Sequence, residues 1–254
     1  PGQPEEVKPE ESWNVEAGLR IGHKGLRAEL VGFFNDYNNL TGQCTLSVNC
    51  DGDLLDRQHN GGEVFVYGVE ALLSGEVPLP GDFRLKPTVT YTWTGSRFQN
   101  SFRSASPHFG TVREGDSLGY VPEHRGAATV GLEHELGGIE LGVSAQSAMR
   151  EMPGQGELDE ADSIPAMASL DLNLQLRVTR HAHFYATFSN LTNEVQMLAR
   201  RPYGARPARP FHAMFGVKLS LNPRGRGLVD LAREAEGRKK SRSEQVVESK
   251  ESGS

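Results

Sequence analysis

The chain has 254 residues, of which 37% are hydrophobic, and its formal net charge is −6. This length allows one large domain or two small ones, and so mild a negative charge gives no electrostatic case for binding nucleic acid. The sequence contains no run of 18 consecutive apolar residues, so it predicts no membrane-spanning helix. A membrane-spanning β-barrel stays open, because its strands give only short alternating segments.

Alternation of apolar and polar residues predicts about nine β-strands. The seventh is the most regular, because every even position from Ala168 to Val178 is apolar and every odd position from Ser169 to Thr179 is polar. A period of two is the side-chain period of a strand, so such a segment has one apolar and one polar face. In chain order the predicted strands span residues 12–22, 25–38, 63–75, 82–96, 123–135, 139–150, 167–179, 182–191 and 211–221.

The connections between these strands alternate in length. The turns at 23–25, 76–81, 136–138 and 180–181 are short, whereas the loops at about 39–62, 97–122, 151–166 and 192–210 are long. Short turns at one end and long loops at the other are typical of outer-membrane barrels. Trp13, Tyr37 and Trp93 fall near the long-loop ends of their strands, where an aromatic girdle is expected.

Charged residues follow the polar faces of these strands. We expect them to line the barrel interior and to pair across strands. They are Glu16, Arg20, Arg27, Glu29, Glu70, Arg84, Glu133, Asp171 and Arg177.

The first long loop holds both cysteines, Cys44 and Cys50, within a Gly-, Asn- and Asp-rich segment. A loop disulfide in an oxidising compartment is predicted, with two unpaired thiols as the alternative. A zinc site would need further ligands. His181 and His183 share one strand face without a nearby carboxylate, which favours a solvated turn over a metal site. No nucleophile-elbow or phosphate-loop pattern occurs, so no enzyme activity is predicted.

The strand count bears on completeness. With nine strands, the first begins at the long-loop side and the last ends at the short-turn side, whereas a whole bacterial barrel has an even number of strands. No charged-then-apolar leader follows Pro1. We therefore expect residues 1–221 to be the C-terminal portion of a larger antiparallel up-and-down transmembrane β-barrel, an open curled all-β sheet when isolated. Residues 222–254 are rich in charged and small polar residues and are expected to form a mostly disordered or short-helical periplasmic tail, with a possible helix at 227–240.

Six segments resemble motifs of one family and occur in its order. They are residues 9–20 (PEESWNVEAGLR), 33–37 (FFNDY), 61–70 (GGEVFVYGVE), 115–116 with 120–124 (GD and YVPEH), 190–194 (NLTNE) and 200–207 (RRPYGARP). Together they are similar to TonB-dependent outer-membrane receptors across about residues 9–221. The paired cysteines and the last two motifs look most like the iron(III) dicitrate branch.

The resemblance implies an outer-membrane protein of a Gram-negative bacterium, in contact with outer-membrane lipid, that imports a ferric siderophore or ferric citrate. It implies no resident cofactor or metal. The energy would come from the inner membrane through the TonB complex. The family's N-terminal plug and coupling box have no counterpart in the chain, so we expect this coupling to depend on a preceding part. The family usually ends at a terminal aromatic residue, whereas here the last strand ends at Leu221 and a tail follows.

Ferric citrate is anionic, and arginine binds carboxylates through two parallel hydrogen bonds. The arginines on the long loops are therefore the candidate ligand-binding residues: Arg97, Arg103, Arg113, Arg200, Arg201 and Arg206. Two alternatives have no transport role. One is a soluble antiparallel β-sandwich that serves as a binding module, and the other is a small outer-membrane barrel.

Overall fold

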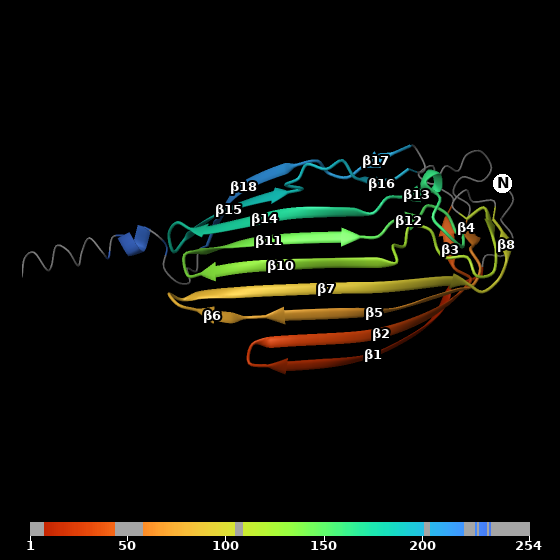
Figure 1. The fold of residues 1–254 in the computed structure, drawn as a ribbon, viewed down its shortest axis with the longest axis horizontal. Helices are drawn as coiled ribbons and strands as arrows, with labels where there is room; N and C mark the ends of the chain where they lie inside the picture. The colour runs from red at the N-terminus through yellow and green to blue at the C-terminus, as the bar shows by residue number, and fades with distance from the viewer. Residues whose placement is uncertain are drawn as a thin grey trace, which may run out of the picture.

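The structure is a computed structural model that describes residues 8–43, 58–104, 109–200, 204–220, 227, 229–232 and 234. Its main feature is one antiparallel sheet in which each strand pairs with the next long strand along the chain (Figure 1). The short strand β6 also pairs with β7. In chain order, the strands of this sheet are β1 (Glu11–His23), β2 (Leu26–Asn38), β5 (Val64–Gly75), β6 (Val77–Leu79), β7 (Phe83–Phe98), β10 (His124–His134), β11 (Gly137–Gln146), β14 (Met167–Arg177), β15 (Ala182–Ser189) and β18 (His212–Leu219).

The nine predicted strands are confirmed, with their ends shifted by a few residues. The largest shift is at β11, which ends at Gln146 rather than at residue 150. Met149 and Arg150 instead pair with Ile164 and Ser163 in a separate two-stranded hairpin. The short strand β6 was not predicted. Between β1 and β2, Lys24 and Gly25 both have positive φ, as a two-residue hairpin turn requires.

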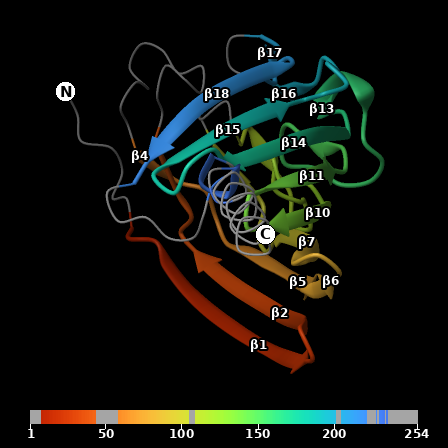
Figure 2. The same cartoon turned by 90° about the vertical axis from the view of Figure 1, so that its left-hand side faces the viewer.

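The sheet curls about the axis of its strands and remains open between β1 and β18 (Figure 2). This confirms the predicted open curled sheet. The soluble sandwich is wrong, because a sandwich needs a second large sheet, and every other sheet within the described residues has only two strands.

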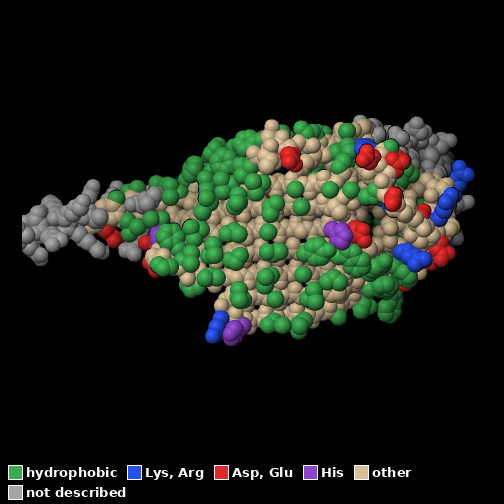
Figure 3. Space-filling view, in the orientation of Figure 1, with side chains coloured by type: hydrophobic (Ala, Val, Ile, Leu, Met, Phe, Trp, Pro, Cys, Tyr) green, Lys and Arg blue, Asp and Glu red, His purple; other side chains and the backbone are tan. Residues whose placement is uncertain are grey.

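One face of the sheet is apolar, because residues directly opposite each other on neighbouring strands share a face. The register aligns an unbroken row of apolar residues across seven strands: Ile21, Ala28, Leu73, Val89, Ala128, Val143 and Leu170. These side chains are not packed in a core, since Ile21 is 57% exposed and Leu73 55%. Figure 3 shows this convex face, with charged side chains gathered mainly at the ends of the strands.

The opposite, concave face is polar, and several of its charges pair across strands as predicted. Arg177 is an exception, because it makes no ion pair within the described residues. Arg20 Nε lies 2.7 Å from Glu29 Oε1 on the neighbouring strand. Farther along the sheet, Glu133 Oε2 lies 2.6 Å from Lys86 Nζ and 3.5 Å from Arg84 Nη2. The alternation visible in the sequence therefore assigns each charge to the correct side of the sheet.

Each of the four long connections contains its own two-stranded hairpin, which the sequence analysis did not anticipate. All four hairpins lie at the same end of the sheet (Figure 1). They are β3 (Thr41–Gln43) with β4 (Gln58–Asn60), β8 (Phe102–Arg103) with β9 (Thr111–Val112), β12 (Met149–Arg150) with β13 (Ser163–Ile164), and β16 (Met197–Ala199) with β17 (Arg206–Pro207). A 3₁₀ turn, η3 (Glu160–Asp162), precedes β13.

The hydrophobic core lies beneath these hairpins rather than in the middle of the sheet. Val64, Phe98 and Val112 are essentially inaccessible to solvent, and Tyr37, Leu40, Val66, Phe102, Phe109 and Leu118 pack against them. Tyr37 was expected in the outer aromatic girdle, and that assignment is wrong. It pairs with Val64 and so faces the core. The convex face at this end carries Trp13, Phe34, Phe65, Tyr67 and Trp93 instead.

At the other end of the sheet, residues 229–232 and 234 are helical, within the predicted helix. The rest of the predicted tail, apart from Gly227, lies outside the described residues. Val229 N donates to Val178 O, and Asp230 Oδ2 accepts from both Arg180 N and Gly227 N at 2.8 and 2.9 Å. The helical residues are therefore attached to the β14–β15 turn. Among the residues that the structure describes, no helix is long and apolar enough to cross a membrane.

Candidate functional site: the loop-side mouth

We call the end of the sheet that carries the four hairpins the loop-side mouth. Its first fixed point is the turn after β9. Gly115 has φ +91°, and Asp116 is only 5% exposed. The Asp116 carboxylate accepts from Arg113 N at 2.8 Å and from Gln155 Nε2 at 3.1 Å. The first contact closes the turn after β9, and the second attaches this turn to the loop that follows β12.

The segment before β10 attaches the long loop between β7 and β10 to the convex face of the sheet. Glu123 O accepts from Thr94 N, and its carboxylate accepts from Trp93 Nε1 at 3.4 Å. The Nδ1 atom of His124 lies 2.8 Å from the hydroxyl of Tyr91. Aromatic side chains with one polar end are the kind that lie at a membrane–water boundary. This ring of contacts therefore marks where the strands end and the loops begin.

The fourth loop begins with a turn built around Asn190, which is 5% exposed and has φ +51°. Its amide donates to Glu194 O and Arg209 O at 3.0 and 3.1 Å, and its Oδ1 accepts from Glu194 N at 3.1 Å. Asn193 Oδ1 accepts from Phe211 N at the far end of the loop. Asparagine tolerates positive φ better than most residues and can bond to nearby backbone. The asparagines of this motif therefore close the loop, and the side-chain amide of Asn190 is bonded within it.

Arg200 joins the third and fourth loops. Its Nε lies 3.7 Å from Glu151 Oε1, and its terminal nitrogens donate to the carbonyls of Glu160 and Ala161. Each of its three nitrogens thus already faces an acceptor within the protein. Glu151 is buried, with 3% of the residue exposed.

The remaining candidate arginines fall into two groups. Arg97 pairs with Phe65, whose ring contacts Phe34 at 5.1 Å, so it lies on the convex face above the aromatic residues. Arg103 is on β8 and Arg113 follows β9, so one hairpin brings these two exposed side chains to the mouth. Arg206, on β17, is also exposed there.

Arg201 and both cysteines, Cys44 and Cys50, lie outside the described residues, so the expected disulfide stays a prediction. Within the described residues, no group of three or more His, Cys, Asp or Glu side chains could hold a metal ion. The mouth also presents three exposed guanidinium groups, those of Arg103, Arg113 and Arg206.

With this geometry in place, comparisons with known proteins identify the class. The sequence model of the family described as "TonB dependent receptor-like, beta-barrel" matches residues 1–191. The chain belongs to this family, which confirms the resemblance at that level. No curated protein sequence matches the chain.

Solved structures share the fold at low sequence identity. The ferric-catecholate import receptor Fiu from E. coli K12 matches with a TM-score of 0.56 and 19% identity, over 84% of this chain and 28% of its own. The copper transporter OprC matches with a TM-score of 0.60 and 15% identity, over 85% and 32%. The ferric citrate transporter FecA in its unliganded form matches with a TM-score of 0.58 and 16% identity, over 83% and 31%.

The chain thus spans about a third of the length of these structures. These proteins are named for a ferric catecholate, copper and ferric citrate, respectively, as their cargo. Proteins with the same fold therefore carry chemically different cargoes, and the fold alone does not choose among them.

Proposed function

We propose that this chain forms part of the barrel wall of a TonB-dependent outer-membrane receptor that imports a ferric chelate, with ferric citrate as the leading candidate. The hairpins would face the cell exterior, and the short turns and the residues after β18 would face the periplasm. Outer-membrane lipid would cover the convex face, and the inner membrane would supply energy through the TonB complex.

The observation that carries this proposal is the asymmetry of the two ends. Four folded hairpins gather at one end, and turns of a few residues close the other. A band of exposed apolar side chains lies between them. Such a band is costly in water, whereas hydrocarbon accommodates it, and long outer loops with short inner turns are the pattern of outer-membrane barrels.

The choice of an anionic chelate rests on the exposed arginines of the mouth. Arg103 and Arg113 share one hairpin, and Arg206 is presented by another. Guanidinium groups bind carboxylates through paired, charge-assisted hydrogen bonds. Arg200 and Arg97 fit this role less well, because Arg200 holds two loops together and Arg97 lies on the convex face.

The test is binding of radiolabelled ferric citrate to isolated outer membranes that contain the native protein. Replacing Arg103, Arg113 and Arg206 together by Ala should weaken binding at least about tenfold, the loss expected from one or two charge-assisted contacts. Arg20→Ala is the matched control, since Arg20 pairs with Glu29 within the sheet. Ferric catecholate and copper serve as competing cargoes.

Unchanged binding in the triple variant would reject the arginine assignment. Binding of only the catecholate or copper would reject ferric citrate. If none of the three cargoes binds, the alternative of an outer-membrane barrel without a transport role is favoured.

A further inference from the structure

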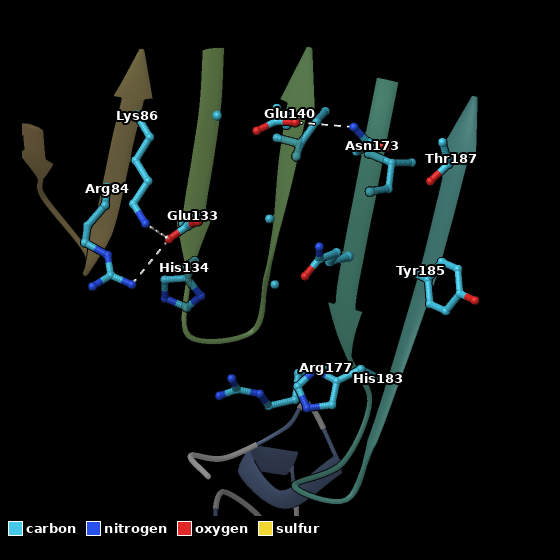
Figure 4. Close-up of a pocket in the computed structure, with 16 residues that line it drawn as sticks. Arg84, Lys86, Glu133, His134, Glu140, Asn173, Arg177, His183, Tyr185 and Thr187 are labelled. Atoms are coloured by element: carbon cyan, nitrogen blue, oxygen red, sulfur yellow. Dashed lines mark hydrogen bonds and ion pairs between the residues drawn. The ribbon is translucent and has the colours of Figure 1, made fainter. Parts of the chain in front are cut away.

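A second cationic feature lies on the concave face at the opposite end of the sheet. Arg177 at the end of β14 pairs directly with His183 on β15, and His183 pairs directly with Lys218 on β18. Directly paired residues share a face of the sheet. We call these three side chains the basic row. Figure 4 shows Arg177 and His183 close together beside the β14–β15 turn.

The basic row contains no acid, unlike the charges on the neighbouring strands. Arg84 and Lys86 both contact Glu133, and Glu140 accepts from Asn173 Nδ2 at 3.3 Å. Each of these charged side chains therefore has a polar partner within the protein.

The side chains of the basic row differ in this respect. Within the described residues, Arg177, His183 and Lys218 make no side-chain hydrogen bond or ion pair, and Arg177 Nε is buried without a partner. Leaving a buried donor unpaired is costly, more so when it carries charge. An anion bound beside it would supply the missing acceptor.

Two adjoining hollows, each of about 440 Å³, meet at the basic row. Both are lined by Gln175, Arg177, His183 and Tyr185, and Lys218 lines the second. Volumes in this range accommodate small organic ligands. The hollows therefore combine space with donors from three adjacent strands.

The spacing of the basic row selects the kind of anion. Neighbouring strands lie about 4.8 Å apart, so the first and third members of the row are separated by roughly 10 Å at the backbone. A single phosphate carries its charge at one centre, whereas the row extends across three strands. A molecule with several carboxylates spread along a short chain can contact each of the three side chains.

We propose that the basic row is a binding site for a small polycarboxylate anion at the short-turn end of the lumen. This proposal rests on the proposed function in one respect, because the anion is taken to be the carboxylate ligand of the cargo. In that role the site receives the anionic chelate after it leaves the loop-side mouth and before release at the short-turn end. The site is distinct from the mouth, because the strands of the sheet separate the two.

The test measures the site without measuring transport. The native protein in detergent is treated with an amine-reactive reagent, and modification of each lysine is followed by mass spectrometry. Lys218 is exposed and can react. Metal-free citrate should slow its modification by about tenfold at saturation, whereas acetate or inorganic phosphate at equal ionic strength should protect it far less, because neither spans the row.

One lysine is an internal control, and one substitution is diagnostic. Lys24 lies in the β1–β2 turn and lines neither hollow, so citrate should leave its rate of modification unchanged. Arg177→Gln should weaken citrate protection of Lys218 about tenfold, the loss expected of one charge-assisted contact. Arg20→Gln, on the same face of the sheet but outside both hollows, should not.

The outcomes separate the two proposals. Equal protection of Lys24, equal protection by phosphate, or protection that survives Arg177→Gln would overturn the polycarboxylate site. Protection of Lys218 in a protein whose mouth fails to bind ferric citrate would leave this site standing and reject the proposed cargo. Ferric citrate binding at the mouth without protection of Lys218 would support the proposed cargo and reject the polycarboxylate site.

Discussion

Arg200 and Glu151 lie 3.7 Å apart, Nε to Oε1, at the junction of two loops that are separate in sequence. The Glu151 side chain is 2% exposed, whereas that of Arg200 is 31% exposed. A carboxylate buried to this extent needs a cation or several donors nearby. Arg200 also donates to the Glu160 and Ala161 carbonyls, so one guanidinium connects β12, η3 and the end of β16.

Arg200→Ala should loosen the third loop, because it leaves Glu151 without this cation. Breaking a buried ion pair costs about 3 kcal/mol, and the partial exposure of Arg200 places this case at or below that value. Hydrogen exchange of the amides from Ala161 to Ile164 should accelerate. Arg206→Ala, an exposed arginine on the paired strand, should leave the exchange unchanged.

A second replacement checks the cause. Adding Glu151→Gln to Arg200→Ala removes the buried charge and should restore part of the lost protection. If the double variant exchanges faster than Arg200→Ala alone, the ion pair is not what holds the loop.

Val130→Arg should destabilise the protein in a bilayer by about 2–4 kcal/mol, the cost of an arginine near the midplane on the lipid side. Val130 is in the middle of β10, 52% exposed on the convex face, and pairs with Leu141, which pairs with Leu172. Thr129→Arg changes the adjacent residue on the concave face and should cost much less. Unfolding in lipid vesicles measures both, and equal costs would argue against lipid contact.

Asn190→Ala should destabilise the fourth loop more than Asn190→Gly. Both replacements remove the side-chain hydrogen bonds to Glu194 and Arg209, at about 1 kcal/mol for each bond. Only Ala adds the strain of a positive φ, about 1 kcal/mol more. Limited proteolysis within 192–210 measures the difference. Equal sensitivity of the two variants would show that the backbone conformation contributes little.

Gly68→Ala should disrupt the loop-side end of β5. A Cβ atom at this position would lie 2.1 Å from Trp93 O and 2.6 Å from Phe33 Cζ, so the neighbouring strand would have to move. Gly32→Ala is the matched control, since its Cβ would lie 3.9 Å from the nearest atom. The yield of folded protein in the outer membrane should fall for Gly68→Ala alone. A similar loss in both variants would point to the cost of changing any strand glycine.

Much of the fold could be predicted from the sequence because strands leave a local signal. The alternation at 167–179 corresponds to β14, Met167–Arg177, and the charges assigned to the polar face lie on the concave side, where Arg20 pairs with Glu29. Positions that break the alternation could not be assigned to a face from the sequence. Val64 and Val66 sit on the expected polar face of β5 because they pack into the core beneath the hairpins.

The candidate site was less predictable. Of the motifs that indicate the family, those that contain Asp116 and Asn190 proved to be turns that attach loops, and they leave the ligand-binding residues unidentified. The arginines carried no such signal. Arg97, Arg103 and Arg200 look equivalent in the sequence, yet one lies on the convex face, one on an exposed hairpin and one against a buried carboxylate.

The sequence by itself determined the strands, their two faces, the alternation of turn lengths and the family, because each depends on residues close together along the chain. Only the tertiary structure decided which side chains meet across strands and loops. The partnership of Arg200 with Glu151, the burial of Tyr37 and the alignment of Arg177, His183 and Lys218 depend on strand register and loop packing. Most of these contacts join residues far apart in sequence, so no local pattern encodes them.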